Sequence, residues 1–211
     1  LAVVTGSLRN WLHSRGIRTE GLELRALVPV SIRTEDERGD LGNRIALMRE
    51  RLAILCDAIA PYGLRYGLEF IGPASFRRGK PNVYIHDLPG LLELIEAVGR
   101  DNLGVLLDAW HWYTSGGTAE DLDRLNDQLV VVVHVNDAPA GIPLEEQIDQ
   151  VRALPGETGV IPLETFMGAL AKMGYTGPVM VEPFSERVRQ LDPEQAVAET
   201  ARALESIWPA S

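Results

Sequence analysis

Short apolar runs alternate along the chain with longer segments in which apolar residues recur at helical spacing. The runs predict strands at residues 22–32, 64–71, 103–107, 129–135 and 178–181. The repeats predict helices at residues 46–60, 88–98, 118–125, 162–173 and 193–207. Asp87 is placed to cap the second helix, and Gly63, Gly99 and Gly174 follow helices at positions where glycine commonly ends them. Residues 138–151 are predicted to form a loop with a short helical turn.

Strands that are apolar throughout, each followed by a helix, predict a parallel sheet covered on its faces. Such β/α units build either a closed barrel or an open doubly wound sheet. No Gly-x-Gly-x-x-Gly follows an early strand, so nothing supports the dinucleotide-binding form of the open sheet. The chain has no linker, low-complexity tract or charge block, and we therefore predict one α/β domain over residues 1–211.

Composition narrows the classes of partner. The net charge of -10 argues against a nucleic-acid partner, because neutralising phosphates needs clustered Lys and Arg. No apolar run approaches the ~18 residues of a membrane span. No charged segment followed by an apolar one opens the chain, so we expect no secretory signal. The single cysteine, Cys56, lies in an apolar stretch and predicts a buried thiol in a reducing compartment. These features together predict a cytoplasmic protein without a membrane partner.

Four consecutive predicted strands end in a carboxylate or an imidazole, namely Glu69, Asp108, His134 and Glu182. In a parallel β/α barrel these strand ends meet on the face where active sites are built. Three carboxylates brought together repel one another unless a cation neutralises them. This donor set suits Mn²⁺, Co²⁺ or Mg²⁺, with Zn²⁺ also open. The sequence thus predicts one divalent-metal site, and the alternative is a solvated cluster of polar residues.

The segments GLEF, LLDAWHW, VVVHVND, LPGETGVIPL and GPVMVEPF resemble the xylose-isomerase-like barrel family, in particular its sugar phosphate isomerase/epimerase branch. The resemblance runs from about Leu22 to the C-terminus. It implies an eight-stranded (β/α)8 TIM barrel with one catalytic metal held by Glu69, Asp108, His134 and Glu182. It further implies isomerisation or epimerisation of a sugar or sugar phosphate through an enediolate, with Glu69 and Glu182 as the acid–base pair.

The same resemblance implies contacts with a small sugar or polyol-ketone substrate. His111 and Arg152 resemble residues that reach substrate oxygens, although a strand-end histidine and an exposed loop arginine would look the same. Trp110 and Trp112 straddle His111 and could pack against the C–H faces of a sugar, or could belong to the core.

Three further polar residues are candidates for supporting roles. Asn136 and Asp137 follow His134 and are placed to orient metal ligands. Glu157 either orients His134 or nearby loops, or is an ordinary turn residue.

The length differs from what the family implies. Its barrel needs ~250 residues, whereas about 68 residues precede Glu69. We therefore expect a barrel that lacks its first two or three β/α units, as a fragment, as a partly resolved protein or as a natural half-barrel completed by a partner. Open sheet edges would favour a homo-oligomer.

Three other functions remain open at this stage. DNA-repair endonucleases with three zinc ions share the fold, but they need further histidines, and none follows His134. A dehydratase of an inositol-derived ketone would use the same metal and the same proton abstraction. A non-catalytic barrel relic would bind a metal or a sugar without turnover.

Overall fold

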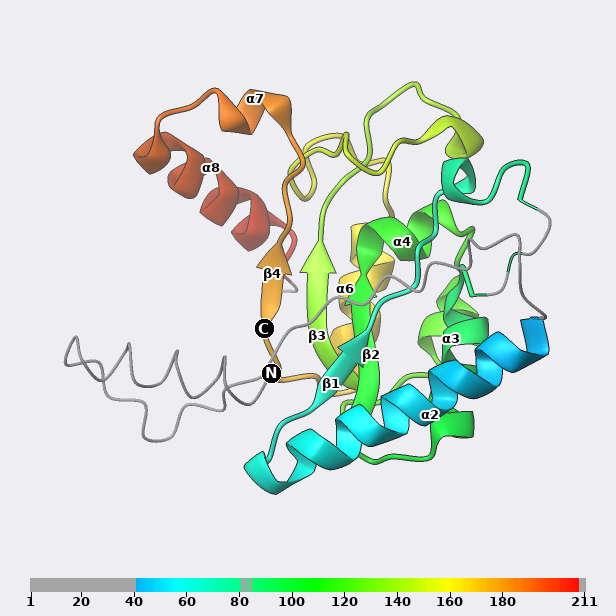
Figure 1. Cartoon of the computed structure of the whole chain (residues 1–211). Coiled ribbons are helices and arrows are strands. Elements are labelled where there is room, and N and C mark those ends of the chain that lie inside the picture. The colour runs from blue at the N-terminus through cyan, green and yellow to red at the C-terminus, as the bar shows by residue number, and fades with distance from the viewer. Residues whose placement is uncertain (1–40, 81–82, 84, 209–211) are drawn as a thin grey trace.

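The computed structural model describes the fold of residues 41–80, 83 and 85–208, and the side chains from Ile45 onward (Figure 1). The strand predicted at residues 22–32 lies outside the described residues. Within the described part of the chain, no helix is both long enough and apolar enough to cross a membrane.

Four parallel strands form one sheet in the order β1-β2-β3-β4. Their bounds are Tyr66–Leu68 for β1, Leu103–Asp108 for β2, Val130–Val135 for β3 and Val179–Val181 for β4. Each strand pairs with the next one along the chain, which is the arrangement of successive β/α units. The α/β class and the parallel sheet predicted from the sequence are confirmed.

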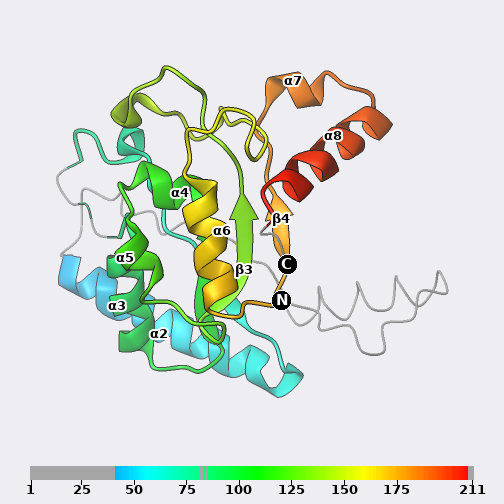
Figure 2. The same ribbon diagram turned by 180° about the vertical axis from the view of Figure 1, so that it is seen from behind.

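Helices lie between the strands, before the first strand and after the last. The long ones are α2 (Leu41–Ile59), α3 (Leu88–Val98), α6 (Leu163–Lys172) and α8 (Pro193–Ser206). The short ones are α4 (Ala109–Thr114), α5 (Ala119–Leu122) and α7 (Glu186–Arg189), and 3-10 turns η1, η2 and η3 cover Ala60–Tyr62, Ala74–Phe76 and Leu144–Glu146. The helix α6 lies behind β3 in Figure 1 and in front of it in Figure 2. Helical periodicity did not predict α4 and α7, because segments of six and four residues are too short to show it.

The core lies between the sheet and its helices. Every residue of β2 and β3 is buried, which explains why both strands are apolar without alternation. Helix α3 begins and ends as predicted. The side chain of Asp87 accepts a hydrogen bond from the Gly90 amide at 2.9 Å, and Gly99 closes the helix at φ 63°. Such a left-handed position strongly favours glycine.

The sheet register brings the candidate residues to one edge. Asp108 pairs directly with His134 across β2 and β3, and Val135 pairs with Val181 immediately before Glu182. The strand ends, α4 and the loop that contains η3 lie together at the upper end of the sheet in Figure 1. The fold therefore gathers polar strand ends on the face where β/α proteins bind ligands.

Candidate metal centre

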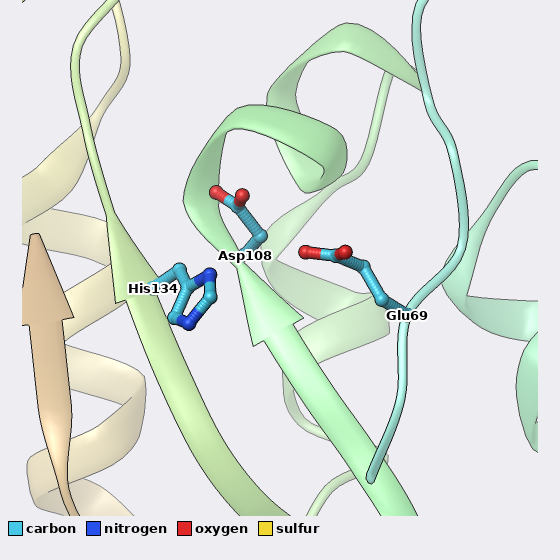
Figure 3. Close-up of side chains that lie close together, drawn as sticks. All are labelled: Glu69, Asp108 and His134. Carbon is cyan, nitrogen blue, oxygen red and sulfur yellow. The ribbon is translucent and has the colours of Figure 1, made fainter. Parts of the chain in front are cut away.

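Glu69, Asp108 and His134 lie together at the carboxyl ends of β1, β2 and β3 (Figure 3). Each offers one ligand atom, and these atoms all lie within 4.8 Å of one another. Two donors on opposite sides of one ion lie about 4.4 Å apart. The three atoms are therefore close to the spacing of ligands that share one ion. All three residues are buried, with exposed fractions of 7%, 0% and 8%.

Asp108 is the most firmly held of the three. Its Oδ1 accepts hydrogen bonds from the Trp110 amide at 2.8 Å and from Asn136 Nδ2 at 3.1 Å, and its Oδ2 accepts from Arg152 at 2.9 Å. Burial raises the pKa of Asp108, but Arg152, the nearby histidines and the Trp110 amide together hold it below its usual range. Asp108 is therefore an ionised, oriented carboxylate that also caps α4.

Glu182 follows β4 and lies beside this group rather than within it. Its Oε2 is 3.6 Å from His134 Nδ1 and accepts a hydrogen bond from Arg152 at 3.0 Å. The interaction with His134, assisted by Arg152 and opposed by partial burial, lowers the pKa of Glu182. Its side chain is 35% exposed, so solvent or a substrate can reach it.

The residues present fit a divalent cation. Glu69 Oε1 and His134 Nδ1 are buried and have no hydrogen-bond partner among the described residues. Leaving such atoms unpaired is costly. Burial, together with the charges of Asp108 and Glu182, raises the pKa of Glu69 to about 9. A cation bound here would supply the missing partner and offset the repulsion, and oxygen donors with one imidazole suit Mn²⁺, Co²⁺, Mg²⁺ or Zn²⁺.

The raised pKa of Glu69 predicts how stability depends on pH without a metal. The folded chain keeps Glu69 protonated up to about pH 9, whereas the unfolded chain ionises it above its ordinary value of 4.5. The folded state thus binds the extra proton, and this contribution to the free energy of unfolding falls as pH rises from 4.5 to about 9.

We expect Glu69→Gln to remove this decrease in the free energy of unfolding with rising pH. The variant should then be more stable than wild type at pH 8, and the difference in stability should be smaller at pH 5. Urea denaturation in the presence of a chelator measures it. The matched control is Glu205→Gln, which replaces an exposed glutamate of α8. Parallel pH profiles for wild type and Glu69→Gln would contradict the prediction.

His111 lies in α4 and faces the same group. Its Nδ1 accepts a hydrogen bond from the Gly72 amide at 3.3 Å, so the neutral ring carries its hydrogen on Nε2. Burial lowers the pKa of His111, which favours this neutral form. Nε2 lies 3.9 Å from Glu69 Oε1 and 3.8 Å from Asp149 Oδ1. Gly72 must be glycine, because a Cβ there would collide with the His111 carbonyl oxygen.

Arg152 contacts acidic and aromatic side chains on several sides of the site. It is 4% exposed, and its guanidinium lies 5.2 Å from the Trp110 ring centroid and 4.7 Å from that of Phe184. Besides Asp108 and Glu182, it binds Asp149. Sequence reasoning missed Asp149, Phe184 and Gly72. A signal existed only for Asp149, which precedes Arg152 by three residues, the spacing of a local ion pair.

Both tryptophans are buried. Trp112 packs against Phe166 at 5.6 Å between ring centroids and donates from Nε1 to the Thr118 carbonyl at 3.1 Å, within the core cluster. Trp110 is in the same cluster but borders the site through Arg152. Of the two interpretations that the sequence left open, core packing describes the surroundings of Trp112.

The supporting residues contact different parts of the site. Asn136 binds Asp108 directly. The Asp137 carboxylate accepts hydrogen bonds from backbone amides of the following loop, namely those of Ala138, Thr158, Gly159, Val160 and Ile161. Glu157 accepts from the Leu154 amide at 2.8 Å and pairs with Arg187. Asp137 and Glu157 thus shape the loop that carries LPGETG.

Comparison with known proteins identifies the family to which this α/β fold belongs. The model of the family described as xylose isomerase-like TIM barrel matches residues 20–207. The inosose isomerase of Halalkalibacterium halodurans is 33% identical over 146 residues, which are 69% of this chain and 49% of that protein. A xylose isomerase domain protein from Alicyclobacillus acidocaldarius has a TM-score of 0.77 and 31% identity, over 86% of this chain and 63% of that one.

The IolI protein, whose structure contains a zinc atom, has a TM-score of 0.73 and 24% identity, over 86% of this chain and 62% of that one. At this identity the likeness shows the fold alone. The chain spans about half the length of the inosose isomerase that it matches. On these findings the chain belongs to the xylose isomerase-like TIM barrel family.

Proposed function

We propose that this chain carries the catalytic centre of a divalent-metal-dependent isomerase that moves a proton next to the carbonyl group of a small polyol ketone or sugar. The observation that carries the proposal is the meeting of Glu69, Asp108 and His134 at one edge of the sheet, with ligand atoms within 4.8 Å. Glu182, beside His134, is the fourth proposed ligand.

The sheet order supports an acid–base pair. Glu69 follows β1 and Glu182 follows β4, the first and last of the four strands, so the two carboxyl groups flank Asp108 and His134. A substrate carbon held between them could lose a proton to one carboxylate and receive one from the other. Two carboxyl groups on opposite sides suit inversion of one carbon, whereas moving a hydrogen between neighbouring carbons needs only one of them to remove and return the proton.

The remaining residues have proposed roles in binding. His111, with its hydrogen on Nε2, would donate to a substrate oxygen, and Arg152 would donate through Nη1. A bound divalent ion would supply a positive charge that stabilises the negative charge developing on the carbonyl oxygen. The rings of Trp110 and Phe184 hold the arginine side chain and keep water from it.

The relatives support a proposal for the class of substrate. The inosose isomerase that this chain resembles is named for a cyclic polyol ketone. Such a molecule has a carbonyl with hydroxyl-bearing neighbours, which suits paired carboxylates and a cation that binds oxygen. We therefore propose an inosose or a similar polyol ketone as the substrate.

The test is metal-dependent exchange of a substrate hydrogen. The chain is stripped with a chelator, incubated with 2-keto-myo-inositol in D₂O, and given Mn²⁺, Co²⁺, Mg²⁺ or Zn²⁺ in turn. We expect deuterium to enter next to the ketone only with an added ion, as measured by mass spectrometry. A product that has lost water would identify a dehydratase. Metal binding without exchange of this ketone or of D-fructose would overturn the proposal.

A further inference from the structure

We propose that Asp149 is a positioning residue that aims Arg152 and His111 at the substrate. This inference rests on the proposed function, and it concerns a loop residue with no metal ligand among its neighbours in sequence. The juxtaposition that carries it is a single carboxylate oxygen, Asp149 Oδ1, lying against both proposed substrate contacts.

Asp149 holds one edge of the Arg152 guanidinium. Arg152 Nε donates to the Asp149 carbonyl oxygen at 3.0 Å, and Nη2 donates to Asp149 Oδ1 at 2.9 Å. Two bonds to one residue fix both the position and the rotation of a planar guanidinium. The rings of Trp110 and Phe184 further limit its motion.

The opposite edge of the guanidinium faces the reacting centre. Arg152 Nη1 donates to Asp108 Oδ2 at 2.9 Å and to Glu182 Oε2 at 3.0 Å. Asp149 therefore holds the edge formed by Nε and Nη2, whereas Nη1 faces the carboxylates of the site. With the first edge held by Asp149, Nη1 can pass from a site carboxylate to a substrate oxygen without the side chain leaving its place.

The same oxygen faces His111. Asp149 Oδ1 lies 3.8 Å from His111 Nε2, while the Gly72 amide binds the other ring nitrogen. The negative charge of Asp149 thus favours the orientation in which Nε2 carries the hydrogen and points into the site. One loop carboxylate sets the direction of two donors that come from different elements, α4 and the segment after η3.

Asp149 is not needed to keep the backbone of Arg152 in place. The Arg152 amide donates to the Phe184 carbonyl at 3.0 Å, and Ala153 pairs with Asp137 through two backbone bonds. Gln147, fully buried in the same loop, donates to the carbonyl oxygens of Pro139 and Ile142. Loss of the Asp149 side chain should therefore loosen the guanidinium while the loop remains folded.

The experiment compares the whole chain with Asp149→Ala and Asp149→Asn. The control is Glu146→Ala, which removes an exposed acidic side chain from the same loop. Zinc binding, followed by calorimetry, should stay within about threefold of wild type in every variant, because Asp149 is outside the proposed ligand set. The KM for 2-keto-myo-inositol should rise about 10- to 100-fold in Asp149→Ala, with a smaller change in kcat. Asp149→Asn keeps an acceptor oxygen and should recover most of the loss.

A second readout does not depend on turnover. The Arg152 Nη2–H resonances in a low-temperature nitrogen-correlated NMR spectrum should be sharp and slow to exchange in wild type, because Nη2 donates to the Asp149 carboxylate at 2.9 Å. They should broaden or vanish in Asp149→Ala, which removes that carboxylate. Wild-type turnover with an unchanged KM in Asp149→Ala would overturn the role of Asp149 alone. If wild type turns over no ketone, the proposed function fails, and the resonances still decide: unchanged Arg152 Nη2–H signals in Asp149→Ala overturn the anchoring, and their loss supports it.

Discussion

Replacing Glu182 with glutamine is expected to lower the rate of metal-dependent hydrogen exchange in a polyol ketone by about 10²- to 10⁴-fold, the usual contribution of a positioned acid or base. Glutamine has nearly the same shape and keeps an oxygen for Arg152, which donates to Glu182 at 3.0 Å. It cannot accept a proton at neutral pH. The variant should still bind the metal, though more weakly, because a neutral amide is a poorer ligand than a carboxylate.

Two measurements separate proton transfer from metal binding in that variant. Deuterium incorporation reports the first, and calorimetric titration with Mn²⁺ or Zn²⁺ reports the second. Glu96→Gln, which replaces an exposed glutamate of α3, should match wild type in both. Exchange at the wild-type rate in Glu182→Gln would remove Glu182 from the chemistry, whatever the metal affinity.

Replacing His134 with alanine is expected to lower metal affinity by more than about 100-fold. Losing a residue that merely orients a ligand costs about 10- to 100-fold, and losing the ligand itself should cost more. His134 supplies the only imidazole in the described group of three, and its buried Nδ1 has no hydrogen-bond partner among the described residues. The remaining carboxylates would also repel one another more strongly without a bound cation.

The control for this variant is another histidine. His86→Ala removes an imidazole that precedes α3 and has a side chain 33% exposed. Elemental analysis after dialysis, together with titration, should show about one ion per chain in wild type and in His86→Ala, and little in His134→Ala. Full occupancy in His134→Ala would show that the ligand assignment is wrong.

Much of the fold could be predicted from local patterns. The Asp87 cap, the helix Leu88–Val98 and the glycine after it are each specified by neighbouring residues, and the structure agrees with all three. The continuous apolar run of β3 predicted a strand buried on both faces, which it is. The start of α5 agrees with the predicted helix at residues 118–125, because Thr118 and Asp121 form a capping box. Its end was predicted less well, because the helix already ends at Leu122.

The contacts around Arg152 could not be predicted in this way. Nothing local shows that a loop arginine will be 4% exposed between two aromatic rings, or that Asp149 will hold it. The need for glycine at position 72 is equally hidden, because the obstacle is the His111 carbonyl oxygen, 39 residues further along the chain.

The sequence by itself determined which residues end the strands, and therefore that Glu69, Asp108, His134 and Glu182 would be candidates for one site. That inference works because carboxyl ends of parallel strands share an edge, whatever else surrounds them. Only the tertiary structure decided the ionisation state and the exposure of each of these groups. Asp108 is ionised and held by three donors, Glu69 is buried with a pKa raised to about 9, and Glu182 lies partly exposed beside His134. Burial and distances between distant segments set these differences, and neither is encoded in any short stretch of sequence.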